Sequence, residues 1–197
     1  MTDYDPKTAL VVVDVQNDFA DPGGSLYVQE GEEVVVVINH EIDLAREAEA
    51  TIVYTQDWHP EETPHFVSGG GIWPVHCVRG TWGAELHPRL HVVGESIKKG
   101  TGGEDGYSGF TVRDPESGER RATSLEEILR RRGVEKIVVA GLATDYCVKE
   151  TALDGIGKGF DTTVLASAVR AVNLAPGDGE KALEAVERAG GRVDPGR

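Results

Sequence analysis

The stretch Thr8–Asp14, TALVVVD, is a nearly continuous apolar run that ends directly in a carboxylate. Short runs of this kind are typical of strands that are buried on both faces of a parallel sheet. Similar runs recur along the rest of the chain. They are Thr51–Thr55, His91–Ile97, Lys136–Gly141, Thr162–Ala166 and the short Gly191–Val193. We therefore expect a central sheet of about six strands, most of them parallel.

Helical patterns lie between these runs. Glu32–Ala50 has apolar residues near helical spacing, and although Val34–Val37 has strand propensity, the length of the segment favours a helix. Ser124 and Glu127 have the spacing of a capping box, and Gly133 is a helix stop signal. The further expected helices are Asp145–Lys158 and Gly179–Ala189. Alternating strands and helices predict an α/β fold, a three-layer α/β/α sandwich, formed here by one domain over residues 1–197.

Composition narrows the class of protein. A chain of 197 residues suits one domain, and its apolar runs are too short to span a membrane. Met1–Lys7 is polar and acidic, unlike a secretory signal, so we expect a cytoplasmic protein. Only Cys77 and Cys147 occur, which argues against a disulfide scaffold. The net charge of −14 repels nucleic acid and anionic membranes. We expect a small-molecule substrate, and the oligomeric state stays open, a homo-oligomer included.

Reactive side chains stand where the expected strands end. Asp14 ends the first strand, Asp57 and His59 follow the second, Lys98 and Lys99 end the third, and Cys147 comes shortly after the fourth. In open α/β sheets, ligands bind beyond the carboxyl ends of the strands. We therefore expect an acid, a metal-binding pair, a lysine and a cysteine to share one rim of the sheet.

Cys147 falls near the first turn of the helix that follows the fourth strand. The positive end of a helix and a nearby lysine both favour a thiolate, and a carboxylate could accept the proton. An isolated cysteine is more often a small buried residue, but the polar strand ends favour a nucleophile here. Asp14 ends an apolar strand, where an unpaired carboxylate is costly, so it either caps the following loop or handles a proton. Asp18 competes for this role, although it lies further along the loop.

A metal site is the second element of the hypothesis. Asp57 and His59 are two residues apart, so in an extended chain they point to one side. His76 or His65 could complete a set of three ligands, which leaves positions open for water or substrate. Zinc, iron and manganese all accept such ligands. An Asp-x-His pair without further context is a weak signal, because most such pairs are ordinary surface residues.

Two segments, Asp57–Leu90 and Gly100–Ala122, are longer than connections between elements need to be, and long loops are often functional. Within the second, Asp114–Arg121 is typical of a solvated hairpin or loop. Several aromatic residues lie in the expected loops. They are Phe19, Trp73, Trp82, Tyr107 and Phe110. Such residues either stack on a flat aromatic substrate or form a small core of their own, and the sequence leaves both interpretations open.

Six segments together carry a family resemblance. They are Val12–Phe19 (VVDVQNDF), Asp57–Pro60 (DWHP), Trp73–Thr81 (WPVHCVRGT), Lys99–Gly100, Tyr107–Phe110 (YSGF) and Gly141–Val148 (GLATDYCV). In this order they resemble the nicotinamidase (pyrazinamidase) group of the isochorismatase-like cysteine hydrolases. The matches cover most of the chain from Leu10 to Phe160. Each segment alone is a weak signal, whereas the ordered set is highly specific.

The resemblance implies roles for the residues of the rim. Asp14 would be the general acid/base, Lys99 the catalytic lysine and Cys147 the nucleophile. The implied metal ligands are Asp57, His59 and His76, with His65 matching a histidine that binds metal in some members. The implied substrate pocket consists of Phe19, Trp73, Tyr107, Leu142 and Ala143. The bond between Leu142 and Ala143 is expected to be cis, which would aim the amides of Ala143 and Cys147 at an oxyanion.

The implied activity is the hydrolysis of nicotinamide, and of pyrazinamide, to the acid and ammonia, with a role in NAD salvage. One divalent metal ion, zinc ahead of iron or manganese, would hold the pyridine ring. Two alternatives remain: a related cysteine amidohydrolase acting on carbamoyl or ureido substrates, and a metal-binding protein without turnover. Ser167 departs from the family, which usually has Asp there, and is expected to affect packing under the site rather than the chemistry.

Overall fold

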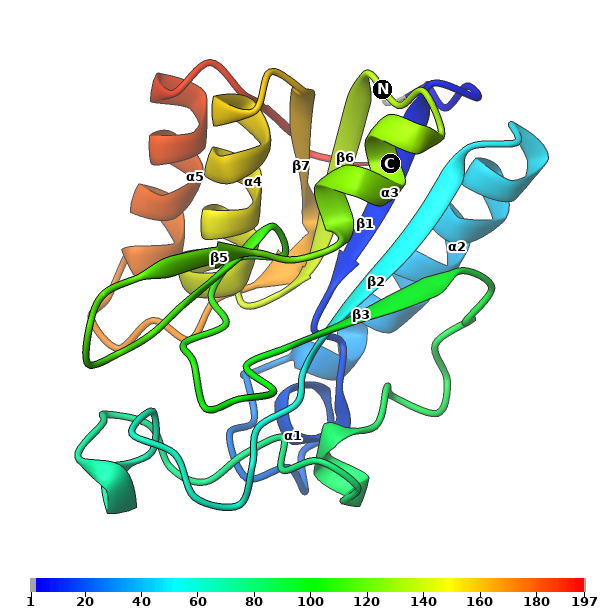
Figure 1. Cartoon of the computed structure of the whole chain (residues 1–197). Helices are drawn as coiled ribbons and strands as arrows, with labels where there is room; N and C mark the ends of the chain where they lie inside the picture. The colour runs from blue at the N-terminus through cyan, green and yellow to red at the C-terminus, as the bar shows by residue number, and fades with distance from the viewer. Residues whose placement is uncertain (1–2, 197) are drawn as a thin grey trace.

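Six parallel strands form the centre of the computed structural model, which describes residues 3–196 (Figure 1). The strands are β1 (Thr8–Val13), β2 (Thr51–Asp57), β3 (Glu95–Lys99), β6 (Lys136–Leu142), β7 (Asp161–Arg170) and β8 (Arg192–Asp194). They lie in the order β3-β2-β1-β6-β7-β8, and each neighbouring pair is parallel. The expected six-stranded parallel sheet is thereby confirmed.

Helices cover both faces of this sheet, with α2 on one face and α3, α4 and α5 on the other (Figure 1). The helices are α1 (Asn17–Ala20), α2 (Val34–Glu47), α3 (Leu125–Arg131), α4 (Lys149–Gly157) and α5 (Asp178–Arg188). Short 3₁₀ turns form at Gly31–Glu33, Val67–Gly69 and Trp82–Ala84, and a π-helical turn at Thr144–Val148. The three-layer α/β/α arrangement is confirmed. None of the helices described is long and apolar enough to cross a membrane.

The continuous apolar run of β1 has a direct structural cause. Leu10 and Val12 belong to the core on the α2 side, whereas Ala9, Val11 and Val13 belong to the core on the opposite side. All five side chains are fully buried. Successive side chains of a strand point to opposite faces, so a strand covered on both faces must be apolar at every position.

The strand order switches from one side of the sheet to the other between β1 and β6. After β1 the chain adds β2 and β3 on one side, and then β6, β7 and β8 on the other. Ligand sites of open α/β sheets lie at such a switch point. Gly141, near the end of β6, has φ of 120°, and a Cβ there would lie 2.0 Å from the carbonyl oxygen of Val13. The bond between Leu142 and Ala143, which follows, is cis as expected.

The starts of the third strand and of the helix near Ser124 differ from the sequence-based expectation. The third strand begins at Glu95 rather than His91, because the preceding Val92 and Val93 lie in an exposed loop. The capping box at Ser124 is wrong, because that residue already has helical dihedrals and its side chain makes no capping bond. The hydroxyl of Thr123 instead accepts a hydrogen bond from the amide of Leu125 at 3.2 Å.

The fifth strand is longer than expected. β7 continues beyond Ala166 to Arg170, and its pairing with β6 shifts in register between Val139 and Gly141. A bulge of this kind lets a strand continue after its regular ladder is interrupted. β7 therefore reaches the same rim of the sheet as the end of β6.

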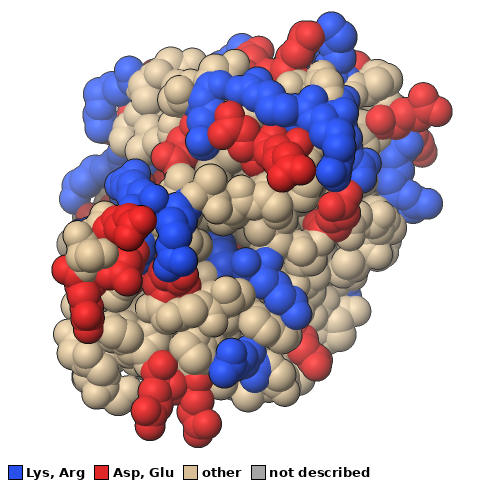
Figure 2. All heavy atoms as spheres, in the orientation of Figure 1, with Lys and Arg blue, Asp and Glu red and all other residues tan. Residues whose placement is uncertain are grey.

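The second long segment folds partly into an antiparallel hairpin of β4 (Thr111–Arg113) and β5 (Arg120–Ala122). The hairpin interpretation of Asp114–Arg121 is thus confirmed in outline. On the face shown in Figure 2, acidic and basic side chains are interspersed. The net charge of −14 is therefore not gathered into one acidic patch on this face.

Candidate active site

Lys99 is the centre of the rim. It is the last residue of β3 and pairs in register with Asp57, the last residue of β2. Its side chain is fully buried, and Nζ lies 2.7 Å from Oδ2 of Asp14 and in contact with Oδ1 of Asp57. Nζ also donates to the carbonyl oxygen of Gly106 and lies 3.8 Å from Sγ of Cys147. The lysine thereby brings together the acid and the thiol that the sequence placed at separate strand ends.

Asp14 follows β1 with a left-handed φ of 49°, a conformation that few residues other than glycine adopt. Its carboxylate is fully buried, and Oδ1 accepts a hydrogen bond of 2.7 Å from the hydroxyl of Thr55. The competing Asp18 has a different task. Its carboxylate accepts the backbone amides of Ser25 and Cys77 at 3.0 and 2.7 Å, and so fastens two loops together. Geometry thus favours Asp14 as the acid that faces the thiol.

The two neighbouring lysines face opposite ways. The side chain of Lys98 is exposed, and its Nζ lies 3.4 Å from the ring centroid of Trp58. Lys99 is 1% exposed. Only Lys99 therefore contacts the thiol, as the alternation along a strand requires.

Burial dominates the electrostatics of Cys147. The residue lies in the π-helical turn after β6, and its Sγ is 3.9 Å from the carbonyl oxygen of Gly106. Burial raises the pKa of the thiol well above its ordinary value, and Lys99 offsets this only in part. The expected effect of the lysine is present, because Lys99 lowers the pKa of the thiol, but burial outweighs it. The thiol keeps its proton until an acceptor takes it.

The charged groups around the thiol are strongly coupled. Burial raises the pKa of Asp14, against the opposing effect of Lys99, so this carboxyl takes up a proton more readily than an ordinary aspartic acid. Burial alone would also raise the pKa of Asp57, but Lys99, His59 and His76 together hold it below its usual range. Although burial by itself lowers the pKa of Lys99, Asp14 and Asp57 raise it well above normal. The centre thus holds one fixed cation, one fixed anion and one carboxyl suited to proton exchange.

Three histidines form a second cluster beside this centre. Ring nitrogens of His59, His65 and His76 lie within 4.8 Å of one another, and all three residues are buried. Oδ2 of Asp57 points to the same place, 3.8 Å from Nε2 of His59 and 4.0 Å from Nε2 of His76. One carboxylate oxygen of Asp57 therefore contacts Lys99, and the other faces the histidines.

This donor set fits a divalent metal ion. Nδ1 of His65 is bonded to Asp105 and Nδ1 of His76 to the carbonyl oxygen of Pro74, both at 2.7 Å, which leaves each Nε2 free. Neither ring nitrogen of His59 has a hydrogen-bond partner in residues 3–196, although the ring is fully buried. Burial lowers the pKa of His76 to about 4, so its ring is neutral near pH 7. Neutral imidazoles with one carboxylate are ligands for zinc, iron or manganese.

A pocket with about 390 Å³ of empty volume, including its open mouth, lies between the two clusters. Its lining includes Phe19, Trp73, Tyr107, Leu142, Ala143, His65, His76, Asp57 and Cys147. All five residues expected to bind substrate are therefore in its wall. Nε1 of Trp73 donates a 2.7 Å hydrogen bond to the hydroxyl of Tyr107, and burial raises the pKa of that hydroxyl to about 12. The walls suit a small flat molecule.

Sequence reasoning missed part of this wall. Tyr146 lines the pocket and packs edge-on against Trp73 with ring centroids 4.8 Å apart. Its place directly before Cys147 in the sequence could have indicated this. Two other loop aromatics do not belong to the pocket. Phe110 is fully buried in the core, where it stacks on Phe160, and Trp82 is half exposed outside the lining.

The departure at Ser167 lies away from the pocket wall. The residue is on β7, and its hydroxyl oxygen is buried without a hydrogen-bond partner in the part of the chain that the structure describes. A Cβ at Gly196 would lie 1.9 Å from that oxygen, so the C-terminal segment packs directly against it. Nothing in the structure explains the serine.

Comparisons with known proteins agree with this geometry. The isochorismatase domain family matches residues 8–193. The nicotinamidase of Escherichia coli (strain K12) is 37% identical over 203 residues, which cover 94% of this chain and 93% of that protein. The crystal structure of a pyrazinamidase of Pyrococcus horikoshii in complex with zinc is 41% identical with a TM-score of 0.84, covering 95% of this chain and 98% of the other. The structure of PnC1 from L. infantum in complex with nicotinate is 34% identical with a TM-score of 0.88, covering 98% and 94%.

Proposed function

The chain belongs to the isochorismatase family and is an amidohydrolase, and from this premise we propose that it is a nicotinamidase. It converts nicotinamide and water to nicotinate and ammonia, and accepts pyrazinamide as well. The observation that carries the proposal is the position of Lys99, buried between Asp14 and Cys147, because Cys147 lines an aromatic pocket. The zinc-bound pyrazinamidase and the nicotinate-bound relative support the choice of substrate.

In the proposed first half-reaction, Asp14 accepts the proton of Cys147, and Lys99 stabilises the resulting thiolate. The sulfur attacks the carboxamide carbon, and the carbonyl oxygen becomes an oxyanion held by the amides of Ala143 and Cys147. One such donor is typically worth about 3 kcal/mol. As the carbon–nitrogen bond breaks, Asp14 returns its proton to the departing ammonia. A thioester on Cys147 remains.

In the second half-reaction, Asp14 takes a proton from water, and the hydroxide adds to the thioester carbon. The carbon–sulfur bond then breaks and the sulfur recovers the proton from Asp14. The product leaves as nicotinic acid, which gives its proton to ammonia or solvent and becomes nicotinate. The raised pKa of Asp14 supports this double duty, because a group that gains and loses a proton works best with a pKa near the working pH. Lys99 keeps its charge throughout and holds Asp14 beside the sulfur.

The second cluster would hold one divalent metal ion, zinc ahead of iron or manganese, through Asp57, His59, His76 and His65. Such an ion supplies a binding point for the pyridine nitrogen, directly or through water, and so positions the ring. Trp73, Tyr107 and Phe19 enclose that ring and exclude water from it. The carboxamide is then presented to Cys147 on the other side of the pocket.

A substrate panel tests the proposal. The protein is incubated with nicotinamide, pyrazinamide and a ureido or carbamoyl amide, while ammonia and the acid product are measured together with metal content. We expect equal amounts of ammonia and nicotinate, and rates on both ring amides far above the rate on the open-chain amide. Turnover restricted to the ureido compound would make the chain a related amidohydrolase. Bound metal without any ammonia would indicate a binding protein without turnover.

The proposal extends to the physiological setting. Nicotinate is a precursor of NAD, so we assign the hydrolysis to NAD salvage in the cytoplasm. Cells that carry the Cys147→Ala variant in place of the active enzyme should then accumulate nicotinamide relative to nicotinate. An unchanged ratio would contradict the role in NAD salvage and would leave the proposed hydrolysis of nicotinamide intact.

A further inference from the structure

His65 is tied to the other long loop by its ring. Nδ1 of His65 lies 2.7 Å from Oδ1 of Asp105, and the two side chains are only 4% and 15% exposed. An ionised carboxylate can only accept a hydrogen bond, so Nδ1 carries the hydrogen and donates it. With Nδ1 taken up by Asp105, Nε2 is the ring nitrogen that is left for a metal ion.

The backbone of Asp105 is itself held in place. Its amide donates to the carbonyl oxygen of Arg113 at 2.8 Å, and its carbonyl oxygen accepts the amide of Arg113 at 2.9 Å. Arg113 is the last residue of β4, so pairing with the hairpin fixes the position of the Asp105 backbone and the direction in which its side chain leaves it. The carboxylate is positioned by a regular element and not by a free loop.

A second contact ties the same two segments at the backbone of His65. The hydroxyl of Thr63 donates to the carbonyl oxygen of Gly103 at 2.8 Å and accepts the amide of His65 at 3.2 Å. His65 is thus oriented at its main chain and at its ring by the segment that leads from β3 to β4. Among residues 3–196, His65 is also the sole ion-pair partner of Asp105.

The three histidines differ in how they are anchored. The ring of His76 is bonded to the carbonyl oxygen of Pro74, whereas neither ring nitrogen of His59 has a partner in residues 3–196. Among residues 3–196, only the ring of His65 is hydrogen-bonded to a carboxylate, that of Asp105. A carboxylate that accepts from the far ring nitrogen fixes the tautomer and makes the ligating nitrogen more basic.

We propose that Asp105 is a positioning residue for the metal site, and that through it the β4–β5 hairpin sets how tightly His65 binds the ion. This inference rests on the metal-binding part of the proposed function. It assigns His65 as a working ligand in this chain. It also gives the hairpin, which is remote from the thiol chemistry, a role in metal affinity.

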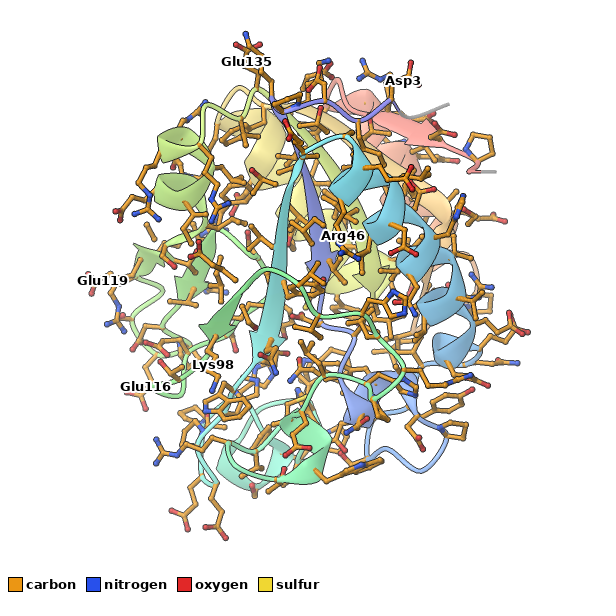
Figure 3. The ribbon with its side chains drawn as sticks, turned by 90° about the vertical axis from the view of Figure 1, so that its right-hand side faces the viewer. Asp3, Arg46, Lys98, Glu116, Glu119 and Glu135 are labelled. Atoms are coloured by element: carbon orange, nitrogen blue, oxygen red, sulfur yellow. The ribbon has the colours of Figure 1, made fainter. Side chains whose placement is uncertain are left out.

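Zinc binding by the full-length protein tests the inference. Metal-free wild type, Asp105→Ala, Asp105→Asn and Glu119→Gln are titrated with zinc against a competing chelator. Glu119→Gln is the matched control, because Glu119 is an exposed carboxylate on the same hairpin and points away from the molecule (Figure 3). Loss of a carboxylate behind a ligand typically weakens metal binding by about 10- to 100-fold, so we expect that loss for Asp105→Ala. Asp105→Asn, which keeps an acceptor oxygen but not the charge, should lie between, and Glu119→Gln should match wild type.

A spectroscopic and a kinetic readout separate positioning from general damage. The visible spectrum of the cobalt-substituted protein should change in Asp105→Ala and not in Glu119→Gln, because only the former alters a ligand. KM for nicotinamide should rise more than kcat falls, and the melting temperatures of the metal-free forms should be similar. Unchanged zinc affinity in both Asp105 variants would overturn the inference while leaving the proposed function intact. Failure of wild type to bind zinc or cobalt would instead overturn the metal role itself.

Discussion

Replacement of Lys99 by methionine probes the centre most strongly, because it removes the cation and keeps the unbranched stem of the side chain up to Cε. In the wild type, Nζ lies 2.7 Å from Asp14 and also contacts Asp57, and all three side chains are buried. The variant would leave two buried carboxylates side by side without their cation. Breaking such a buried pair costs about 3–5 kcal/mol, which for a chain of this size lowers Tm by roughly 6–20 °C.

The size of this loss should depend on pH. The folded-state pKa of Asp14 is already raised by burial, and removal of Lys99, which lowers it, raises it further. When the pKa of a carboxyl is higher in the folded state than in the unfolded state, the free energy of unfolding falls as pH rises from the unfolded-state pKa to the folded-state pKa. The difference in Tm between Lys99→Met and wild type should therefore be larger around pH 8 than around pH 5. Calorimetry of the metal-free proteins at the two pH values measures it.

Lys98→Met is the matched control on the adjacent residue. Lys98 is exposed and its Nζ lies over the face of Trp58, a contact that is worth about 0.5–1 kcal/mol at such sites. Ammonia release should fall by about 10²- to 10³-fold in Lys99→Met, the loss typical of one preorganised electrostatic group, and little in Lys98→Met. Equal losses in the two variants, or a Tm difference that grows at acid pH, would refute the reasoning.

Three further outcomes follow from the site. His76→Ala should lower zinc content and raise KM while the metal-free fold survives, and full zinc content by elemental analysis would remove His76 from the ligand set. A limiting dose of a thiol alkylator should modify Cys147 before Cys77, because Cys147 lines the pocket whereas Cys77 is fully buried. Peptide mass mapping in step with activity tests this order, and prior labelling of Cys77 would contradict it. Trp73→Phe keeps a ring but loses the hydrogen bond to Tyr107, typically about 1 kcal/mol, so KM should rise about fivefold. An unchanged KM would show that this bond does not shape the pocket.

Much of the site could be predicted because the sheet is built from local signals. The apolar runs that lead to Asp14 and Asp57 mark buried parallel strands, and the strand-end rule then places these residues at one rim. The alternation along the third strand predicted that only one of Lys98 and Lys99 would face the thiol, and the family resemblance indicated Lys99. These inferences need only the order of residue types along the chain.

Other features depend on contacts that no local pattern records. Asp105 lies in a glycine-rich loop with nothing in its neighbours to indicate that its carboxylate meets His65. The lysine was expected to lower the pKa of Cys147, and it does, but burial outweighs that effect. Phe110 shares a loop with Tyr107 yet packs into the core, because the chain turns inward within three residues. In each case the environment comes from segments distant in sequence.

The central claim, a thioester on Cys147, is tested most directly by the rate of nicotinamide hydrolysis in Cys147→Ala. The variant is compared with wild type at equal zinc content, with ammonia and nicotinate measured together and binding of nicotinamide measured separately. We predict that the variant binds zinc and nicotinamide and releases no ammonia above background. Appreciable hydrolysis by Cys147→Ala would contradict the account, because the nucleophile would then have to be water activated at the metal site rather than sulfur.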